Sequence, residues 1–263
     1  MQSPPPVADD GILKVAILAV GGQGGGVLTG WIEDVARAQG YVAQATSVAG
    51  VSQRTGATIY YIEMARDTGR VPVFALKPAA GDVDVMIAAE MMEAGRAILR
   101  GFVTPDRTVL IASTHRALAV SEKMAPGDGI ASSDEVMAAA EVAARAVVAA
   151  DFEAVAVAAG SVISASLLGA LAGSGALPFP REAYEAAVRA GGKGVEASLR
   201  AFGAAYGVAR GGAVPEAAPA VRARVGGRRA TARTLRGRPT AWPTALPRRS
   251  SPFRPVRSTR GCG

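Results

Sequence analysis

Apolar runs of strand length alternate with segments of helical periodicity along the first half of the chain. Residues 13–20 form a nearly continuous apolar run that ends at Gly21, a pattern typical of a strand buried on both faces of a parallel sheet. Apolar positions then recur at helical spacing over residues 26–39, and Gly40 follows as a stop signal. A strand, a glycine turn and a helix in this order predict the opening unit of a doubly wound fold.

Further strands are expected where β-branched and aromatic residues gather, at residues 41–48, 57–64, 83–88 and 108–113, with a helix over residues 90–100. The alternation predicts an α/β fold, a three-layer α/β sandwich with a mostly parallel, Rossmann-like sheet.

The chain becomes alanine-rich after residue 132. The pattern predicts a helix over residues 134–150 capped by Ser133. Residues 155–171 are apolar and small, which suits a helix packed closely against a neighbour or a partner chain, although their β-branched residues leave a strand open for the first half. Two surface helices are expected after Pro180, over residues 181–190 and 195–205.

The periodicity stops past Tyr206. Residues 207–263 hold 13 arginines, seven prolines and one acid, Glu216, so this segment carries +12 and residues 1–206 carry −5 of the total +7. No core can form from such a composition, which predicts a disordered tail. Translation of GC-rich DNA in a wrong reading frame is the alternative. The expected organisation is an extension over 1–12, a domain over 13–206 and this tail.

Charge and cysteine content exclude several classes of protein. The basic charge lies on the tail, which offers no folded face or defined motif to present it, so we expect no nucleic-acid partner. The single cysteine, Cys262, cannot build a disulfide framework or a thiolate metal cluster from this chain alone. Apolar stretches stop short of the roughly 20 residues that span a bilayer, and the polar start is unlike a signal peptide. We therefore expect a soluble, cytoplasmic protein without a membrane partner.

The glycine turn, residues 21–26, does not match the dinucleotide fingerprint Gly-x-Gly-x-x-Gly. Counted from Gly22 the third position is Val27, and counted from Gly24 it is Thr29. An acid about 20 residues beyond the turn, which would hold a ribose, is also missing. The turn is interpreted as a tight connection that brings backbone close to a ligand or a neighbour. A stand-alone NAD(P)- or nucleotide-binding Rossmann-like enzyme stays open as the alternative.

Two weaker signals have ordinary interpretations. Gly127-Asp128-Gly129 starts like the motif that holds magnesium and thiamine diphosphate, but the chain contains no Asn to complete the metal's oxygen shell, so a turn is favoured. His115 follows the fifth expected strand, at the edge where open α/β sheets bind ligands. Because it has no acid or nucleophile beside it in sequence, it is interpreted as a hydrogen-bonding surface residue, with catalysis as the alternative.

Four segments in order carry a resemblance to a known family. They are Gly21-Gly22-Gln23-Gly24, Gly50-Val51-Ser52-Gln53-Arg54-Thr55-Gly56, Gly81-Asp82-Val83-Asp84, and Glu90 with Glu93-Ala94-Gly95-Arg96. Over about residues 14–206 the chain resembles the small subunit of indolepyruvate oxidoreductase, the gamma-type domain of the pyruvate and 2-oxoacid:ferredoxin oxidoreductases. The resemblance implies an accessory subunit, inactive alone, of a heteromeric enzyme. That enzyme converts an aryl 2-oxoacid and coenzyme A to an aryl-acetyl-CoA and carbon dioxide, and passes electrons to ferredoxin.

The resemblance also implies where the cofactors lie. Thiamine diphosphate, magnesium and the iron–sulfur clusters are expected on the large partner subunit and none on this chain alone, with coenzyme A as co-substrate. No catalytic or metal-binding residue is assigned here. The residues expected beside the coenzyme A cleft or the subunit contact are Gly22, Gln23, Gly24, Gly25, Gln53, Arg54 and Gly56. Arg54 is the best candidate to meet a phosphate or a partner carboxylate.

Two departures from the family pattern stand out. Thr55 occupies the middle of a loop that more often reads Arg-Gly-Gly, so its backbone is expected to differ. Relatives of this subtype also continue as ordered sequence where this chain turns into its tail, so a missing C-terminal domain is an open possibility. The choice among 2-oxoacids is expected to lie on the partner.

Overall fold

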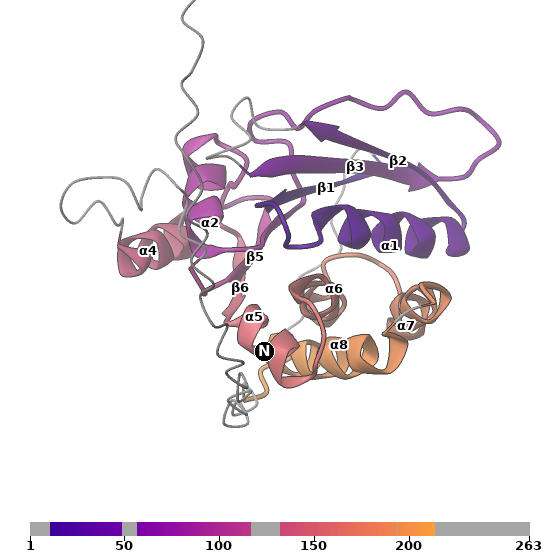
Figure 1. Ribbon diagram of the computed structural model, residues 1–263. Coiled ribbons are helices and arrows are strands. Elements are labelled where there is room, and N and C mark those ends of the chain that lie inside the picture. The colour runs from indigo at the N-terminus through magenta and orange to yellow at the C-terminus, as the bar shows by residue number, and fades with distance from the viewer. Residues whose placement is uncertain (1–10, 49–56, 117–131, 193, 214–263) are drawn as a thin grey trace, which may run out of the picture. The chain divides into compact units, whose positions relative to one another are not determined.

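The computed structural model describes residues 11–48, 57–116, 132–192 and 194–213 (Figure 1). They contain one six-stranded sheet of order β2-β3-β1-β4-β5-β6. The strands are β1 (Ile12–Ala19), β2 (Tyr41–Val48), β3 (Thr58–Arg66), β4 (Val85–Ala88), β5 (Val109–Ser113) and β6 (Ala146–Ala150). β1, β4, β5 and β6 run parallel, whereas β3 is antiparallel to both β1 and β2. The α/β fold is confirmed, with a mixed sheet whose parallel part is the β1-β4-β5-β6 half.

Alternate residues of the strands face two separate hydrophobic cores, because side chains along a strand point to opposite faces. Val15 and Ile17 pack with α1 (Gly25–Ala38), α5 (Phe152–Ala158), α6 (Ile163–Ser174), α7 (Arg181–Ala190) and α8 (Val195–Ala209). Ala16 and Leu18 pack with α2 (Met91–Leu99) and α4 (Ser133–Ala143). Helices therefore cover both faces of the sheet, which confirms the sandwich (Figure 1).

The helix predicted over residues 134–150 is wrong in its second half. Helix α4 ends at Ala143, and Ala146–Ala150 is strand β6, paired with β5. The Arg145 amide donates to the Thr108 carbonyl at 2.9 Å, which places this segment in register beside β5. Pairing at the open side of β5 thus outweighs the helical preference of alanine. The cap is also one residue earlier, since Ser132 Oγ accepts from the Glu135 amide at 3.3 Å.

The single element predicted over residues 155–171 is two helices, α5 and α6, separated by Gly160 in the left-handed region (φ 70°). Nearly every residue of α6 is buried. A Cβ at Gly169 would lie 2.2 Å from the Phe202 carbonyl oxygen, and one at Gly173 would lie 2.6 Å from that of Tyr206. The small residues therefore allow close packing against α8, within this chain.

None of the described helices is by itself long and apolar enough to cross a membrane. The pair α5 and α6 together meets that test of length and composition, but the two helices are bent by 116° to each other.

The two C-terminal surface helices are confirmed as α7 and α8, and α8 continues to Ala209, three residues past the expected end of the domain. Residues 214–263, which hold nearly all of the expected disordered tail, lie outside the described residues.

A buried ion cluster holds the amino ends of the parallel strands together. Asp84, which is fully buried, accepts from Arg107 Nε at 2.6 Å and from the Lys14 backbone amide at 2.8 Å. Asp82 accepts from Lys14 Nζ at 2.8 Å and from Arg107 at 2.7 Å. The Gly81-Asp82-Val83-Asp84 segment is thus part of the scaffold, at the edge of the sheet opposite the glycine turn.

Candidate functional site

The glycine turn joins β1 to α1 at the carboxyl edge of the parallel strands. Gly22 (φ 93°) and Gly24 (φ 70°) take the left-handed backbone that glycine tolerates best. Gly25 is required for space, since a Cβ there would lie 2.4 Å from the Tyr60 ring. A Cβ at Gly24 would also lie 3.0 Å from Ser164 Oγ. The turn is therefore shaped by a close approach to β3 and to the start of α6.

Gln23 points back toward the sheet and fixes the shape of the turn. Its Oε1 accepts from the Val20 amide at 2.9 Å, and its Nε2 donates to the Ala89 carbonyl at 3.4 Å. Its Nε2 also lies 3.2 Å from Nε2 of His115. Because a backbone amide can only donate, the Val20 contact determines which end of the Gln23 amide is oxygen. Gln23 thus links the ends of β1, β4 and β5.

His115 is held on both sides of its ring. Nδ1 lies 2.8 Å from Ser113 Oγ, which also accepts from the Phe152 amide at 3.1 Å. Since the Gln23 amide nitrogen only donates, Nε2 of His115 must accept, and the ring proton must sit on Nδ1. The side chain is half-buried. The interpretation of His115 as a hydrogen-bonding residue is confirmed, and its bonds form a network that joins the turn to β5.

This geometry makes a spectroscopic prediction. We expect the neutral imidazole of His115 to be protonated on Nδ1, although free histidine favours Nε2. Long-range proton–nitrogen NMR measures this directly, and assignment is simple because the chain contains one histidine. Replacing Gln23 by Leu removes the donor and is expected to let the Nε2-protonated form appear. A wild-type ring protonated on Nε2 would contradict the network.

A cavity of about 340 Å³ opens beside this network. The cavity is lined by the glycine turn, by His115 and by Glu153 at the start of α5. Ser161, Val162 and Ile163 complete the lining. Ser161 Oγ contacts Ser198 Oγ at 3.1 Å. The cavity lining combines neutral polar side chains and one acidic residue, Glu153, with an apolar wall. Such a lining fits a ligand that carries both polar amide-like groups and an apolar chain.

A second polar group lies at the same edge, after β4. The carboxylate of Glu90, almost fully buried, lies 3.8 Å from Arg116 Nε. The Met91 amide donates to the His115 carbonyl at 3.1 Å, which joins this segment to the end of β5. Glu93 pairs with Arg96, but burial is the stronger influence and raises the pKa of the Glu93 carboxyl, and the Glu90 charge adds to this rise. Glu90 and Glu93 are therefore buried structural residues behind the carboxyl edge of the sheet.

Only part of the expected site can be located. Gly22, Gln23, Gly24 and Gly25 lie together in the turn, whereas Gln53, Arg54 and Gly56, with Thr55 between them, lie outside the described residues, as do Gly127, Asp128 and Gly129. Sequence reasoning missed Ser113, Glu153 and Ser161. Ser113 had a usable signal, since it ends a strand two residues before the only histidine. Glu153 and Ser161 had none, because α5 was not recognised as a separate helix.

The resident cofactors of the resembled family can be tested against this site. Among the residues that the structure describes, no three His, Cys, Asp or Glu side chains gather as metal ligands. The described lining of the cavity holds one carboxylate and no cysteine, so it offers neither clustered carboxylates for magnesium nor thiolates for an iron–sulfur cluster.

Comparison with known proteins gives the family. A model of the pyruvate ferredoxin/flavodoxin oxidoreductase family matches residues 14–208. No curated protein sequence matches the chain. Among solved structures, a pyruvate oxidoreductase subunit from Thermotoga maritima is 18% identical with a TM-score of 0.53, covering 75% of this chain and 96% of that one. The gamma subunit of a keto/oxoacid ferredoxin oxidoreductase from Geobacter sulfurreducens is 17% identical with a TM-score of 0.52, covering 76% and 98%.

A third similar structure is larger. The 2-oxoglutarate:ferredoxin oxidoreductase of Magnetococcus marinus, solved with 2-oxoglutarate, coenzyme A and succinyl-CoA, is 15% identical with a TM-score of 0.54. The match covers 78% of this chain and 32% of that one, so this chain spans about a third of that relative. At these identities the structures establish the fold, and the family model covers most of the domain. The chain therefore belongs to the pyruvate ferredoxin/flavodoxin oxidoreductase family.

Proposed function

We propose that the chain is the small, accessory subunit of a heteromeric indolepyruvate-type oxidoreductase. The complex would oxidise an aryl 2-oxoacid with coenzyme A to an aryl-acetyl-CoA and carbon dioxide, and pass two electrons to ferredoxin. The family match supports the reaction class. The aryl substrate rests on the resemblance of the glycine turn and the Gln53-Arg54-Thr55-Gly56 segment to the indolepyruvate type. A cytoplasmic complex without a membrane or nucleic-acid partner is part of the proposal.

The observation that carries the proposal is the cavity beside Gln23 and His115. It lies at the carboxyl edge of the parallel strands, where open α/β sheets bind ligands. Coenzyme A carries amides, an apolar arm and anionic phosphates, and the cavity offers polar side chains, an apolar wall at Val162 and Ile163, and a glycine turn that opens a helix. A structurally similar enzyme was solved with coenzyme A bound, which supports coenzyme A as co-substrate of the complex.

The companion subunit supplies the redox chemistry in this account. Thiamine diphosphate would stabilise the carbanion formed on loss of carbon dioxide, and iron–sulfur clusters would carry the electrons. This chain's residues would contribute by orienting coenzyme A. Gln23 would hold the turn and keep His115 in one tautomer, while the apolar wall excludes water.

The alternative, a stand-alone NAD(P)-binding enzyme, is disfavoured by the order of the strands. Dinucleotide folds place the second strand beside the first and parallel to it, and the helix between the two strands presents its N-terminus to the pyrophosphate of the cofactor. Here β1 lies between β3 and β4, and β2 is an edge strand of an antiparallel hairpin. The first βαβ unit of a dinucleotide site is therefore not formed.

A single substitution tests the coenzyme A role. In the reconstituted complex, Gln23→Leu is expected to raise the KM for coenzyme A about tenfold, because the hydrogen bonds of Gln23 to Val20, Ala89 and His115 are lost, each worth about 0.5–1.5 kcal/mol. The KM for the 2-oxoacid should stay within about twofold, since that substrate would bind on the companion. Steady-state kinetics with each substrate varied in turn make the measurement.

The matched control is Gln39→Leu, which removes an exposed glutamine at the other end of α1. It should leave both KM values unchanged. An assembled Gln23→Leu complex with an unaltered KM for coenzyme A would remove this cavity from the coenzyme A site.

A further inference from the structure

An exposed apolar segment follows β3. Val71, Val73 and Leu76 are 94%, 92% and 71% exposed. They belong to residues 66–77, here called the strap, which passes outside the β2 edge of the sheet (Figure 1). Pro72 and Phe74, between the exposed residues, are half-buried. The side chains thus alternate as in a strand, but the outward face is apolar, which marks an interaction surface.

The strap is anchored, so this exposure is built into the fold. At its start the Asp67 amide donates to the Gly40 carbonyl at 2.9 Å. Near its end the Ala75 amide donates to Glu63 Oε2 at 2.7 Å, and the Leu76 carbonyl accepts from Thr46 at 2.8 Å. Glu63 is buried, and its other oxygen accepts from the Tyr61 hydroxyl at 2.6 Å. Burial, and then this bond, raise the pKa of Tyr61.

The backbone of the exposed part is open to pairing. Residues 71–74 make no backbone hydrogen bond to any other part of the chain that the structure describes. Pro72 has no amide hydrogen, but the amides of Val71, Val73 and Phe74 and the carbonyls of the segment are free within the described part of the chain, so this extended segment can accept a strand from a partner along an edge.

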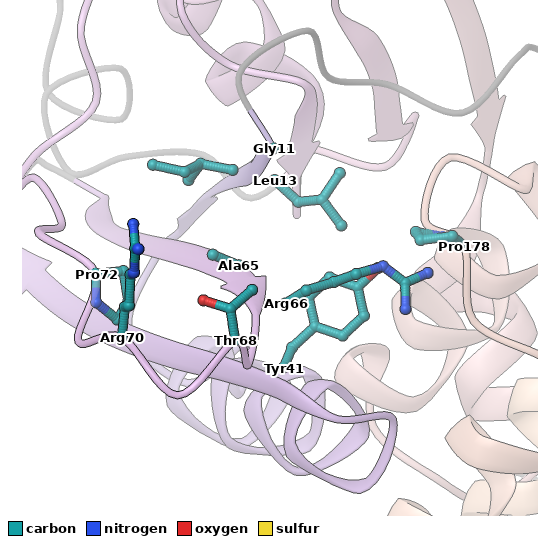
Figure 2. A pocket seen from close by; sticks show the side chains of 10 residues that line it. Gly11, Leu13, Tyr41, Ala65, Arg66, Thr68, Arg70, Pro72 and Pro178 are labelled. Atoms are coloured by element: carbon teal, nitrogen blue, oxygen red, sulfur yellow. The ribbon is translucent and has the colours of Figure 1, made fainter.

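The strap is also positively charged. Arg66 and Arg70 line a cavity of about 430 Å³ together with Tyr41 and Thr68 (Figure 2). The Arg66 guanidinium lies 5.2 Å from the centre of the Tyr41 ring. Neither arginine forms an ion pair within the described residues. With Lys77 the strap has three bases and one acid, Asp67, a net charge of +2.

We infer that the strap is the docking surface for an extended, apolar and acidic segment of the companion subunit. The segment pairs with the backbone of residues 71–74, covers Val71 and Val73, and places a carboxylate in the cavity between Arg66 and Arg70. A second copy of this chain fits less well, because symmetric pairing of two straps brings equal positive charges together. This inference rests on the proposed function and assigns its partner surface.

The test measures assembly of the full chain with the purified companion subunit by isothermal titration calorimetry. The double variant Val71→Asp/Val73→Asp is expected to weaken binding at least about 100-fold, because two carboxylates would face an apolar and acidic partner. Its melting temperature alone should match that of the wild type, since both positions are exposed. The matched control is Leu99→Asp/Val142→Asp, at positions 88% and 78% exposed on α2 and α4, which should bind like the wild type.

A second double variant tests the charged part of the strap. Arg66→Glu/Arg70→Glu is expected to weaken binding at least about tenfold at low salt, with a smaller loss at high salt where charge pairs are screened.

The outcomes separate this inference from the proposed function. If the wild-type chain and the companion form no complex, the proposed function fails, and the inference with it. If they bind and the strap variants bind equally well, only the docking surface is overturned. Self-association of the wild type that is lost in Val71→Asp/Val73→Asp would assign the strap to a second copy. If a truncated chain that starts at Gly11 binds the companion tenfold tighter than the full chain does, the cavity is assigned to Asp9 and Asp10 of the chain itself. Either result overturns the choice of occupant.

Discussion

Replacing Asp84 by Ala is expected to lower the free energy of unfolding by about 3–5 kcal/mol, the cost of removing one partner from a buried ion pair. Its carboxylate is fully buried between Arg107 Nε at 2.6 Å and the Lys14 amide at 2.8 Å. Without it the Arg107 guanidinium loses one of its two carboxylate partners and keeps Asp82, and the Lys14 amide loses its bond to the Asp84 carboxylate, at the amino ends of the strands. Loss on this scale is a large part of the 5–15 kcal/mol that typically stabilises a domain.

Urea unfolding followed by circular dichroism measures the change. The control is Asp34→Ala, because Asp34 is 58% exposed and pairs with Arg37 at 3.6 Å on the surface of α1. Such exposed pairs contribute about 0–1 kcal/mol. A loss below about 1 kcal/mol for Asp84→Ala would show that the ion cluster does not hold the strand ends together.

Most of the fold could be predicted because the hydrophobic periodicity and the residue composition favour the same elements in the first half of the chain. Residues 13–20 are apolar on both faces of the sheet, and glycines mark both ends of α1, so β1 and α1 were placed within one or two residues. The prediction failed where alanine dominates. Residues 146–150 have no helix-breaking residue, and the strand preference of Val147 and Val148 is realised through pairing with β5. Alanine fits either structure, so tertiary contacts decide there.

The candidate site was predictable only in part, for a related reason. The turn was visible because glycines at Gly22 and Gly24 meet a local backbone requirement. His115 could be placed at a strand end, but its network depends on Gln23, 92 residues earlier, and on the amide of Phe152. Contacts of such separation leave no local pattern. The contacts form because the fold brings the ends of β1 and β5 and the start of α5 to the same edge of the sheet.

The second expected result concerns the catalytic activity of the two separate subunits. We expect this chain and the companion subunit each to show less than about 1% of the activity of the complex, because reactive groups that are not held in place cost on the order of a hundredfold in rate. The described residues hold no cluster of metal ligands, and in this account the companion lacks one side of the coenzyme A cleft. Only the assembled enzyme then brings the two substrates together.

Reconstitution tests directly whether this chain is an accessory subunit. The companion large subunit, recognised by its thiamine motif and clustered cysteines, is assayed with indolepyruvate, coenzyme A and a viologen dye as electron acceptor, with and without this chain. We expect negligible dye reduction by either subunit and at least about a 100-fold increase on mixing, dependent on coenzyme A. Full activity of the companion without this chain would contradict it.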